Sequence, residues 1–553
     1  MPLRRYSDRP VFWLFIWLAV NLLQAAFTPL DPDETYYWMY SRFLDWGYFD
    51  HPPAVAVLIA AGKQWLPGAL GLRFGHVIAG GLTLTVVYEL LGRPRGNALL
   101  LAVALSFAQP LLEVYGFIAT PDGPLLLFTA LYLLALQRFL RQPGWSASLL
   151  LGFTMAGLLY SKYHGVILIL FTALPHLWFL VRTPQAWVAA ATGLLLFFPH
   201  LYWQYVHDYP SFRYHLSGRD DPYQWKFTWQ YLVNQLLIFS PLLLIYYVRA
   251  WRNTEFPDRF HQSLRWLIAG TLLFFLYTTT KGRTEAQWTA MLSIPLVLVT
   301  FRAARQQPQA FRGLKTFAWI TIGLLVVARL LLVAPRDWLP FNKPFDHEPW
   351  VKRLAAVAGD RPVIVENSYR FASLYEFYSG GRPGWTVTNV DYRPSQYDLW
   401  RRDSLYQGEE VMVLGQANWK LPAADSFAMQ KGFMLLHSTR DFQVIKDVVL
   451  EIEADGYDSI SIFATAPRPI RLDAPLAVRL RVIGRRPDGS FLYRRLSLSD
   501  RNDIPAKQRT LLYTGPNPLA AEWRTHRIRL GAGLAYAGMA PLREQSELLE
   551  DPD

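Results

Sequence analysis

The sequence predicts a polytopic α-helical membrane protein with a soluble C-terminal domain that is first mixed α/β and then β-rich. Of the 553 residues, 52% are hydrophobic and 18% are charged. Up to Val333 the chain repeats apolar runs of roughly 17–22 residues, the length a helix needs to cross a bilayer. Beyond Pro335 no such run occurs. We therefore expect a transmembrane domain at residues 1–334, an α/β region at 335–440 and a β-rich module at 441–553.

The apolar runs predict about eleven transmembrane helices, with boundaries accurate to a few residues. They are expected near residues 11–28, 72–92, 97–114, 121–139, 147–162, 165–181, 185–201, 229–248, 264–280, 287–301 and 315–334. The apolar stretch 53–67 is shorter and contains Lys63. It is therefore expected to form a helix at the membrane interface.

Basic residues gather in alternate loops, and this pattern predicts the orientation of the chain. One set of loops contains Arg4, Arg5, Arg9, Arg93, Arg95, Arg138, Arg141, Arg182, Arg249, Arg252, Arg259, Arg265, Arg302, Arg305, Arg312 and Lys315. Short loops rich in basic residues stay in the cytoplasm, so this face and the N-terminus are expected there. The protein is thus expected to be a multi-pass membrane protein with a cytoplasmic N-terminus and an extracytoplasmic C-terminal domain.

Composition excludes several kinds of chemistry. The chain contains no cysteine, which rules out disulfides, thiolate metal sites and cysteine nucleophiles. Topology rather than nucleic-acid binding explains the net charge of +12, because the excess basic residues of the first half lie between apolar runs. The sequence has no P-loop, dinucleotide fingerprint, serine elbow or zinc-helix motif. A donor that is already activated and carried by a lipid would fit a site on the outer face.

The most informative segment is Asp31-Pro-Asp-Glu-Thr-Tyr-Tyr-Trp38, directly after the first apolar run. Ionisable groups at membrane depth are usually kept for function, carboxylates can act as general bases, and aromatic faces can stack on sugar rings. Asp33 and Glu34 are therefore candidate catalytic residues, and Tyr36 and Tyr37 are candidate substrate-binding residues. The alternative is a helix N-cap, because acids favour the first turn of a helix.

Two further segments on the predicted outer face contain candidate residues. In Phe49-Asp-His-Pro-Pro53, His51 could contact an anionic head group or an acceptor, although a rigid turn explains the paired prolines equally well. Pro121-Asp122 opens the fourth predicted span. Asp122 either serves only the helix start or points into the cavity beside Asp33, where it would be a third catalytic candidate.

A lysine lies between two apolar runs in Tyr160-Ser-Lys-Tyr-His-Gly165. A buried ammonium needs an anion, and a phosphate is the natural partner for Lys162. Tyr163 and His164 are candidates to assist it. The alternative is that Lys162 extends to the interface and is solvated there.

The short loop Lys281-Gly-Arg-Thr-Glu-Ala-Gln-Trp288 is dense in hydrogen-bond donors and acids. Positive charge on this face runs against the topology rule, which favours a functional reason for it. Lys281 and Arg283 are candidates to hold a phosphate or pyrophosphate. Glu285 and Trp288 are candidates to contact a sugar.

These motifs together resemble the C-type glycosyltransferases. The resemblance is carried by Asp33-Glu34 after the first span, His51-Pro-Pro53, Pro121-Asp122 and Leu158-Leu-Tyr-Ser-Lys-Tyr163. Glu285-Ala-Gln-Trp288 and the soluble segments Tyr369-Arg-Phe-Ala, Phe377-Tyr-Ser-Gly and Gln396-Tyr-Asp-Leu-Trp400 also resemble bacterial members. The most similar groups are the protein O-mannosyltransferase-like and the lipid A aminoarabinose transferase-like families.

The resemblance implies a polyprenyl-phosphate sugar donor and an inverting transfer on the outer face of the inner membrane. It implies that Asp33 is the catalytic carboxylate and that Glu34 and Asp122 position the acceptor or the sugar. Lys162, with Lys281 or Arg283, would stabilise the leaving lipid phosphate. No metal or other cofactor need take part, although a divalent metal is an open alternative. The acceptor would be lipid A, another surface glycan or a protein.

The sequence departs from the family pattern at one position and leaves other functions open. Many aminoarabinose transferase-like members have lysine where this chain has His51, which shifts the expected phosphate contact to Lys162 and to Lys281 or Arg283. The main rival function is a transporter or flippase of lipid-linked sugars. That function would favour charges near the membrane centre, broken helices and inverted repeats. A non-enzymatic receptor or scaffold is a third class.

Overall fold

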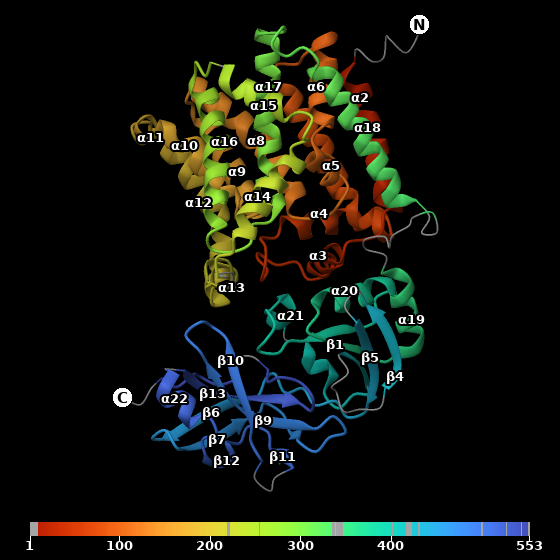
Figure 1. Cartoon of the computed structure of the whole chain (residues 1–553), viewed down its shortest axis with the longest axis vertical. Helices are drawn as coiled ribbons and strands as arrows, with labels where there is room; N and C mark the ends of the chain where they lie inside the picture. Colours follow the sequence, from red (N-terminus) through yellow and green to blue (C-terminus); the bar gives the residue numbers. More distant parts are fainter. Residues whose placement is uncertain are drawn as a thin grey trace. The chain divides into compact units, whose positions relative to one another are not determined.

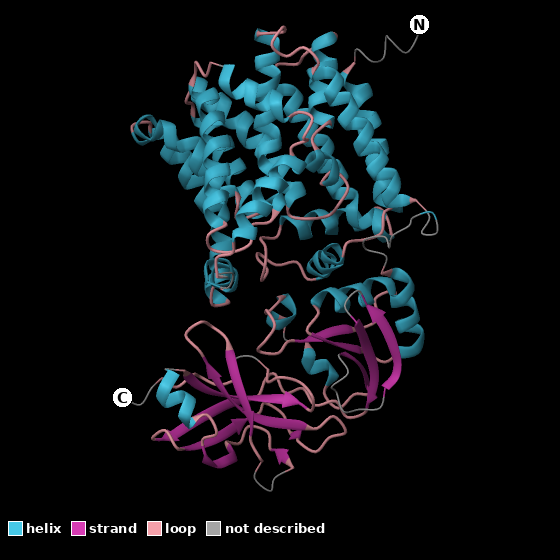
Figure 2. Ribbon diagram, in the orientation of Figure 1, coloured by secondary structure: helices cyan, strands magenta, loops and turns pink. Residues whose placement is uncertain are grey.

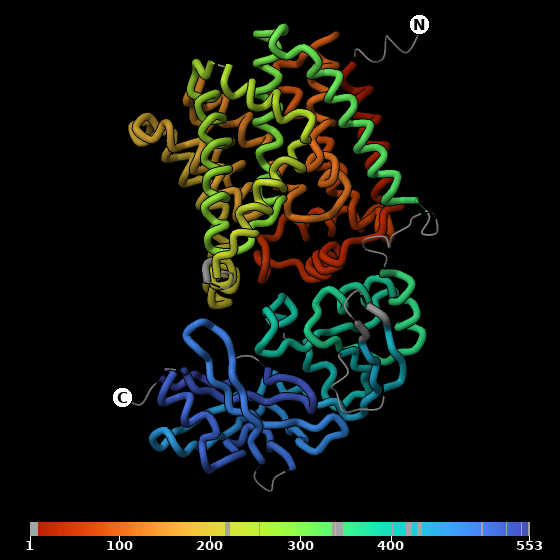
Figure 3. The backbone as a smooth tube through the Cα atoms, viewed as in Figure 1, coloured from red at the N-terminus to blue at the C-terminus, as the bar shows by residue number. Residues whose placement is uncertain are grey.

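The computed structural model describes residues 9–217, 222–253, 255–334, 338, 347–400, 402–415, 423–429, 432–498, 502–526, 528–542 and 545–550. The chain divides into two compact units, Met1–Asp346 and His347–Asp553. Figure 1 labels the elements of each unit, and Figure 3 traces the path of the backbone. Each unit is considered by itself below.

The first unit is helical throughout its described residues (Figure 2). Its α-helices are α2 (Pro10–Phe27), α3 (Pro32–Arg42), α4 (Ala54–Lys63), α5 (Gly68–Leu90), α6 (Asn97–Phe107), α7 (Pro110–Val114), α8 (Asp122–Arg141), α9 (Trp145–Ser161), α10 (Gly165–Ala173), α11 (Leu177–Val181), α12 (Pro184–Val206), α13 (Pro210–Ser217), α14 (Trp225–Ile238), α15 (Leu244–Asn253), α16 (Arg259–Thr278), α17 (Ser293–Gln306) and α18 (Leu314–Val333). The 3₁₀ helices are η1 (Leu174–His176) and η2 (Ala286–Leu292).

Six helical segments of the described chain are long and apolar enough to cross a membrane. They are Pro10–Phe27, Gly68–Leu90, Asp122–Arg141, Pro184–Val206, Ala286–Gln306 and Leu314–Val333. Three of the other predicted spans are interrupted, and each interruption falls at a proline: Pro110, Pro175 and Pro241. Proline removes a backbone donor and clashes with the preceding turn, so one apolar run becomes two short helices. The count of eleven spans therefore stays a prediction.

The end of the bundle near α3, α4 and α13 is the end to which the candidate residues belong (Figure 1). Helix α4 packs on both α3 and α5, and its contact with α5 depends on glycines. An ideal Cβ at Gly75 would lie 2.3 Å from the carbonyl oxygen of Leu58, and one at Gly62 would lie 2.4 Å from that of Gly71. Small residues of this kind let helix backbones approach closely.

A buried polar network joins three helices of the bundle. Arg329 of α18 donates through Nη2 to Glu113 Oε2 of α7 at 2.6 Å and to Asn21 Oδ1 of α2 at 3.1 Å. Trp17 Nε1 of α2 donates to the other oxygen of Glu113 at 2.9 Å. Breaking such a pair would leave an uncompensated buried charge, so the network holds the first and last long helices together.

The second unit begins with a five-stranded sheet of order β2-β1-β3-β5-β4. Its strands are β1 (Val363–Glu366), β2 (Gly384–Val387), β3 (Val411–Gly415), β4 (Ala423–Met429) and β5 (Gly432–Thr439), with β1 parallel to β2 and β3 and the remaining pairs antiparallel. The helices of this region are α19 (Glu348–Ala358), α20 (Tyr369–Tyr378), α21 (Gln396–Leu399) and the 3₁₀ helix η4 (Asp403–Tyr406).

The rest of the second unit is β-rich. Its elements are β6 (Val449–Asp455), β7 (Ser459–Thr465), β8 (Ile470–Arg471), β9 (Val478–Arg485), β10 (Phe491–Arg495), β11 (Asp503–Ile504), β12 (Thr510–Pro516), α22 (Ala520–His526) and β13 (Arg529–Tyr536). They form sheets of order β12-β7-β6, β10-β9-β13 and β11-β8. Gly456 and Gly489 have φ of 63° and 85°, a backbone conformation that favours glycine in the turns at Asp455-Gly456 and Asp488-Gly489. The predicted fold class is confirmed, while the three-part domain division stays a prediction.

Replacement of Gly75 by alanine is expected to destabilise the protein, because the new methyl group would overlap the Leu58 carbonyl. Overpacking of this kind costs about 1–3 kcal/mol. The matched control is Gly323→Ala in α18, where an added Cβ meets no atom within 4 Å. Thermal melting of the purified protein should show a lower midpoint for Gly75→Ala alone, and equal midpoints for the two variants would contradict the tight α4–α5 contact.

Candidate functional site

Helix α3 begins with a capping box that uses two of the three carboxylates of the Asp31–Glu34 segment. Asp31 is the N-cap residue, and its Oδ1 accepts a hydrogen bond from the backbone N–H of Asp33 at 2.7 Å. Glu34 accepts one through Oε2 from the backbone N–H of Asp31 at 3.0 Å. This reciprocal pattern satisfies the orphan donors of the first helical turn. The N-cap interpretation therefore applies to Asp31 and Glu34, and the carboxylate of Asp33 takes no part in the cap.

Glu34 also forms a fully buried ion pair with Arg73 of α5. Arg73 donates through Nε to Oε1 at 2.7 Å and through Nη2 to Oε2 at 2.5 Å, and both side chains are 0% exposed. The remaining donors of Arg73 reach the backbone carbonyls of Ala25, Thr28 and Pro29. The two parallel hydrogen bonds to the carboxylate and the further bonds to carbonyls offset the cost of removing both charges from water.

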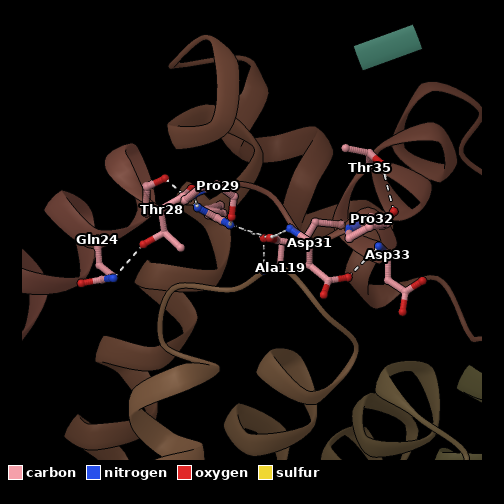
Figure 4. A network of polar contacts seen from close by, with 11 residues as sticks. Gln24, Thr28, Pro29, Asp31, Pro32, Asp33, Thr35 and Ala119 are labelled. Carbon is pink, nitrogen blue, oxygen red and sulfur yellow. Dashed lines mark hydrogen bonds and ion pairs between the residues drawn. The ribbon is translucent and has the colours of Figure 1, made fainter. Parts of the chain in front are cut away.

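The same carboxylate joins the start of α3 to the loop before α8. Glu34 Oε1 accepts a hydrogen bond from the backbone N–H of Ala119 at 2.8 Å. Figure 4 shows this network from Gln24 to Ala119, with the carboxylate of Asp33 pointing away from it. Asp33 is half-buried, whereas Glu34 is buried. The contacts of Glu34 thus position the loop that presents Asp33, and a direct catalytic role for Glu34 stays a prediction.

Helix α8 begins with Asp122, whose carboxylate makes an ion pair instead of a cap. Lys162 Nζ donates to Asp122 Oδ1 at 2.8 Å and to Oδ2 at 3.0 Å, and each side chain is 6% exposed. The lysine therefore does not extend to a solvated interface. Its partner within the protein is Asp122, 40 residues away in the sequence, and the phosphate contact of Lys162 stays a prediction.

Tyr115 lies between the two acidic segments. Burial raises the pKa of its phenol well above the ordinary value, and the charges of Asp122 and then Asp31 raise it further. The phenol therefore keeps its proton at neutral pH. The hydrogen bond from Ala119 to Glu34, and not this effect on the pKa, joins the Asp31–Glu34 segment to the loop before α8.

The aromatic residues that follow Asp33 pack around Asp50. Tyr36 and Tyr40 donate their hydroxyl protons to Asp50 Oδ2 at 2.9 and 3.2 Å. Burial, followed by the neighbouring Tyr36 and Asp50, raises the pKa of Tyr40 well above its usual value. The ring of Tyr37 meets that of His51 edge-on at 5.7 Å. The two predicted segments 31–38 and 49–53 therefore form one wall of the site.

Residues of α12 and α13 lie next to this wall. His215 Nε2 of α13 donates a hydrogen bond to the backbone oxygen of Asp50 at 3.1 Å. Ser211 Oγ donates one to the backbone oxygen of Tyr48 at 2.9 Å. The Tyr163 hydroxyl and Nε2 of His200 in α12 form a hydrogen bond of 3.0 Å. The centres of the Tyr163 and His215 rings are 5.6 Å apart. These contacts bring Tyr163 to His51, because the rings of His51 and His215 are 6.5 Å apart.

The remaining candidates lie toward η2. The ring of His164 packs against those of Phe275 and Trp288, at 5.3 and 5.2 Å, and these two rings also contact each other at 5.7 Å. Lys281 and Arg283 are exposed. Arg283 Nε lies 3.3 Å from Glu285 Oε1 in an exposed ion pair. The structure thus places His164 against Trp288, and among the described residues no hydrogen bond or ion pair joins Lys281 or Arg283 to Lys162.

Sequence reasoning missed several residues of this site: Arg73, Tyr40, Tyr115, His200, Gln204, Ser211 and His215. Of these residues, only Arg73 could have been identified from the sequence, because an arginine near the start of an apolar span is energetically costly without a partner. Within the described residues, no group of three or more carboxylate or histidine side chains could hold a metal ion. All predicted site roles stay predictions at this point.

Removal of one partner of the Glu34–Arg73 pair is expected to be more harmful than removal of both. An unpaired buried charge typically costs about 3–5 kcal/mol. Arg73→Met should therefore lower the melting temperature strongly, and adding Glu34→Gln should recover part of the loss. A double-mutant cycle by thermal melting measures the coupling, and additive effects would show that the two charges are independent.

Comparison with known proteins places this site in a known fold. Residues 50–203 match the family model described as dolichyl-phosphate-mannose-protein mannosyltransferase. No curated protein matches the sequence.

Solved structures give a broader match. ArnT from Cupriavidus metallidurans in the apo state has a TM-score of 0.58 at 14% identity, over 77% of this chain and 97% of that chain. The same protein bound to undecaprenyl phosphate has a TM-score of 0.57 at 14% identity, over 77% of this chain and 97% of that chain. The arabinosyltransferase EmbB from Mycobacterium smegmatis covers 97% of this chain and 63% of that chain, with a TM-score of 0.38 at 12% identity. The predicted resemblance is confirmed: this chain is a multi-pass membrane protein with the C-type fold, and its residues 50–203 are similar to a glycosyltransferase family, which indicates a glycosyltransferase.

Proposed function

We propose that this protein transfers a sugar from a polyprenyl-phosphate donor to an acceptor on the extracytoplasmic face of the membrane, with inversion at the anomeric carbon. The observation that carries the proposal is the placement of Asp33. Its backbone is fixed by the Asp31 cap and the Glu34–Arg73 pair, its carboxylate takes no part in either, and Glu34 ties the loop to the helix that holds Asp122.

Asp33 is proposed as the general base. Its carboxylate takes the proton of an acceptor hydroxyl as the acceptor oxygen bonds to the anomeric carbon. The bond between that carbon and the phosphate oxygen breaks at the same time, and polyprenyl phosphate leaves with the electron pair. A single displacement of this kind inverts the configuration. A positioned base of suitable pKa supplies about 10²–10⁴-fold of rate.

Charge on the departing phosphate needs a cation, and Lys162 is the proposed one. Its ammonium is buried and already held by Asp122, so it is oriented before the donor binds. An ammonium has three donors, and the two oxygens of Asp122 do not exhaust them. Lys281 and Arg283 lie in an exposed loop, and we propose that they meet the phosphate as a second contact. Preorganised charge of this kind stabilises charge that develops in the transition state.

The aromatic residues are proposed to hold the sugar and the acceptor. Tyr36 and Tyr37 line the wall next to His51, while Tyr163, His164 and Trp288 continue it toward η2. Aromatic rings give flat apolar faces, and their polar edges can bind hydroxyl groups. Glu285 is proposed as an acceptor for a sugar hydroxyl, and Glu34 and Asp122 as residues that position the reacting groups.

Two separate observations support the lipid donor and the orientation of the chain in the membrane. One similar structure, ArnT from Cupriavidus metallidurans, is bound to undecaprenyl phosphate. The basic loops of this chain favour a cytoplasmic N-terminus, which would put the start of α3 outside. The acceptor is proposed to be lipid A, another surface glycan or a protein, in a bacterial inner membrane.

The decisive variant is Asp33→Asn, compared with Asp31→Asn in the same loop. Asparagine caps a helix as well as aspartate does, so Asp31→Asn should keep its activity. Asp33→Asn should fold normally and lose about 10²–10⁴-fold of the transfer rate, because an amide cannot accept the proton. The measurement is transfer of radiolabelled sugar from polyprenyl phosphate to acceptor fractions in membranes that contain each protein.

Each outcome of that assay has a distinct meaning. Label that reaches an acceptor fraction with wild type and Asp31→Asn only would support Asp33 as the base and would identify the acceptor. Equal transfer by Asp33→Asn would refute Asp33 and direct attention to Asp122. Absence of transfer from every lipid donor, together with movement of the lipid-linked sugar across the membrane, would favour a flippase instead.

A further inference from the structure

The second unit contains a mainly apolar cavity with a few polar groups, between its five-stranded sheet and its β-rich part. Its walls come from the end of β2, from α21 and η4, from the segment 442–446 and from β13. The space open to the centres of water molecules is about 50 Å³. One water needs roughly 10–15 Å³ by this measure, so the cavity has room for a ligand several water molecules in size.

A buried carboxylate lines this cavity. Asp403 is 6% exposed, and within the described part of the chain its one hydrogen bond is from the backbone N–H of Ser404 to Oδ1, at 3.1 Å. Its other oxygen, Oδ2, has no donor there. A carboxylate has about four acceptor sites, and burying one with most of them unused is costly unless a ligand supplies donors.

The polar groups around Asp403 are held in place. Lys446 Nζ donates to the backbone oxygen of Asp398 at 2.7 Å, which leaves two of its three donors available. Asp398 Oδ2 accepts from Thr388 Oγ1 at 3.1 Å and from the backbone N–H of Ser395 at 2.8 Å. The cavity thus offers a fixed carboxylate acceptor, a fixed ammonium donor and a second carboxylate.

Aromatic rings form the apolar part of the wall. Trp385 is 4% exposed, and its ring packs edge-on against that of Tyr397 at 5.1 Å and lies 6.3 Å from that of Tyr406. Phe442 stacks on Tyr536 at 5.2 Å. A sugar ring has an apolar face of C–H groups and a rim of hydroxyls, so aromatic rings beside carboxylates and an ammonium match both parts of it.

We propose that this cavity binds the edge of one sugar residue of the acceptor, a portion of a few heavy atoms that carries hydroxyls or an amine, and that the sugar is uncharged or carries an amine. This inference rests on the proposed transferase function and adds a second acceptor contact away from the transfer site. Two carboxylates against one ammonium give the cavity a net negative charge, which disfavours phosphates and uronic acids. Hydroxyl or ammonium donors of the sugar would fill the vacant acceptor sites of Asp403.

The test measures binding of free methyl glycosides, so it needs neither a lipid donor nor transfer. The probes are methyl glycosides of neutral hexoses, amino hexoses and uronic acids, added to the full-length protein in lipid nanodiscs. Saturation-transfer NMR reports binding. A neutral or amino glycoside should bind wild type, and Asp403→Asn should weaken it by about tenfold or more, since a charge-assisted hydrogen bond is lost.

Control variants separate this proposal from the transferase proposal. Asp455→Asn changes an exposed aspartate of β6 and should bind normally, as should Asp33→Asn, which lacks the proposed base. Lys446→Gln should weaken binding too, and it tests the cavity even if Asp403→Asn does not fold. Absence of binding by every glycoside, preferred binding of uronic acids, or unchanged binding in both cavity variants would overturn the proposal.

A vacant buried carboxylate also predicts a dependence of stability on pH. Burial raises the pKa of Asp403; Lys446 and Arg468 oppose this, Asp447 adds to it, and the buried Tyr536 stays neutral. A raised pKa means that the folded state binds the proton more tightly than the unfolded state. Folding is therefore weakened as pH rises through the folded pKa, and the penalty disappears below the ordinary value of about 3.9.

Asp403→Asn should accordingly make the unit more stable near pH 7, and this advantage should shrink as the pH falls toward 4. Hydrogen–deuterium exchange of peptides from 384–406, compared between the two proteins at each pH, measures the effect. Slower exchange in the variant at pH 7 only would support a vacant carboxylate. Equal exchange at both values would show that Asp403 is well solvated, which would remove the main support for a ligand site.

Discussion

The ion pair between Glu34 and Arg73 is the constraint on which the site depends. One carboxylate caps α3, accepts from the backbone at Ala119 and pairs with a guanidinium that also binds three carbonyls at the end of α2. Four separate segments are therefore fixed by a single buried pair. A loop that would otherwise be mobile can then hold Asp33 in one place, which is what a catalytic base needs.

The division of labour among the acidic residues follows from this arrangement. Asp31 and Glu34 satisfy the helix terminus, and Asp122 holds Lys162, so each of these carboxylates has a defined partner. The carboxylate of Asp33 takes no part in the helix cap or in these two ion pairs. Adjacent residues of the same chemical type thus have different surroundings because backbone geometry, and not side-chain identity, sets the direction of each side chain.

Much of the fold was predictable from hydropathy, whereas the partners within the site were not. The apolar runs located the helices to within a few residues, but residues 97–114, 165–181 and 229–248 each proved to be two helices, because hydropathy is insensitive to one proline. The residues 31–38, 122 and 162–164 were recognisable from the sequence as candidate functional residues. Their contacts with Arg73, His200 and His215 were not, since those pairings join residues 37 to 52 positions apart and leave no periodic trace.

Arg73 lies near the start of α5, which is one of the six helices long enough to span a bilayer. A spanning helix adjusts its tilt to the hydrophobic thickness of the surrounding lipid. Because the guanidinium of Arg73 is hydrogen-bonded to Glu34 in the segment that contains Asp33, a change of tilt would also move that segment. The thickness of the membrane would therefore affect the position of the proposed base through a side chain that is buried in the bundle.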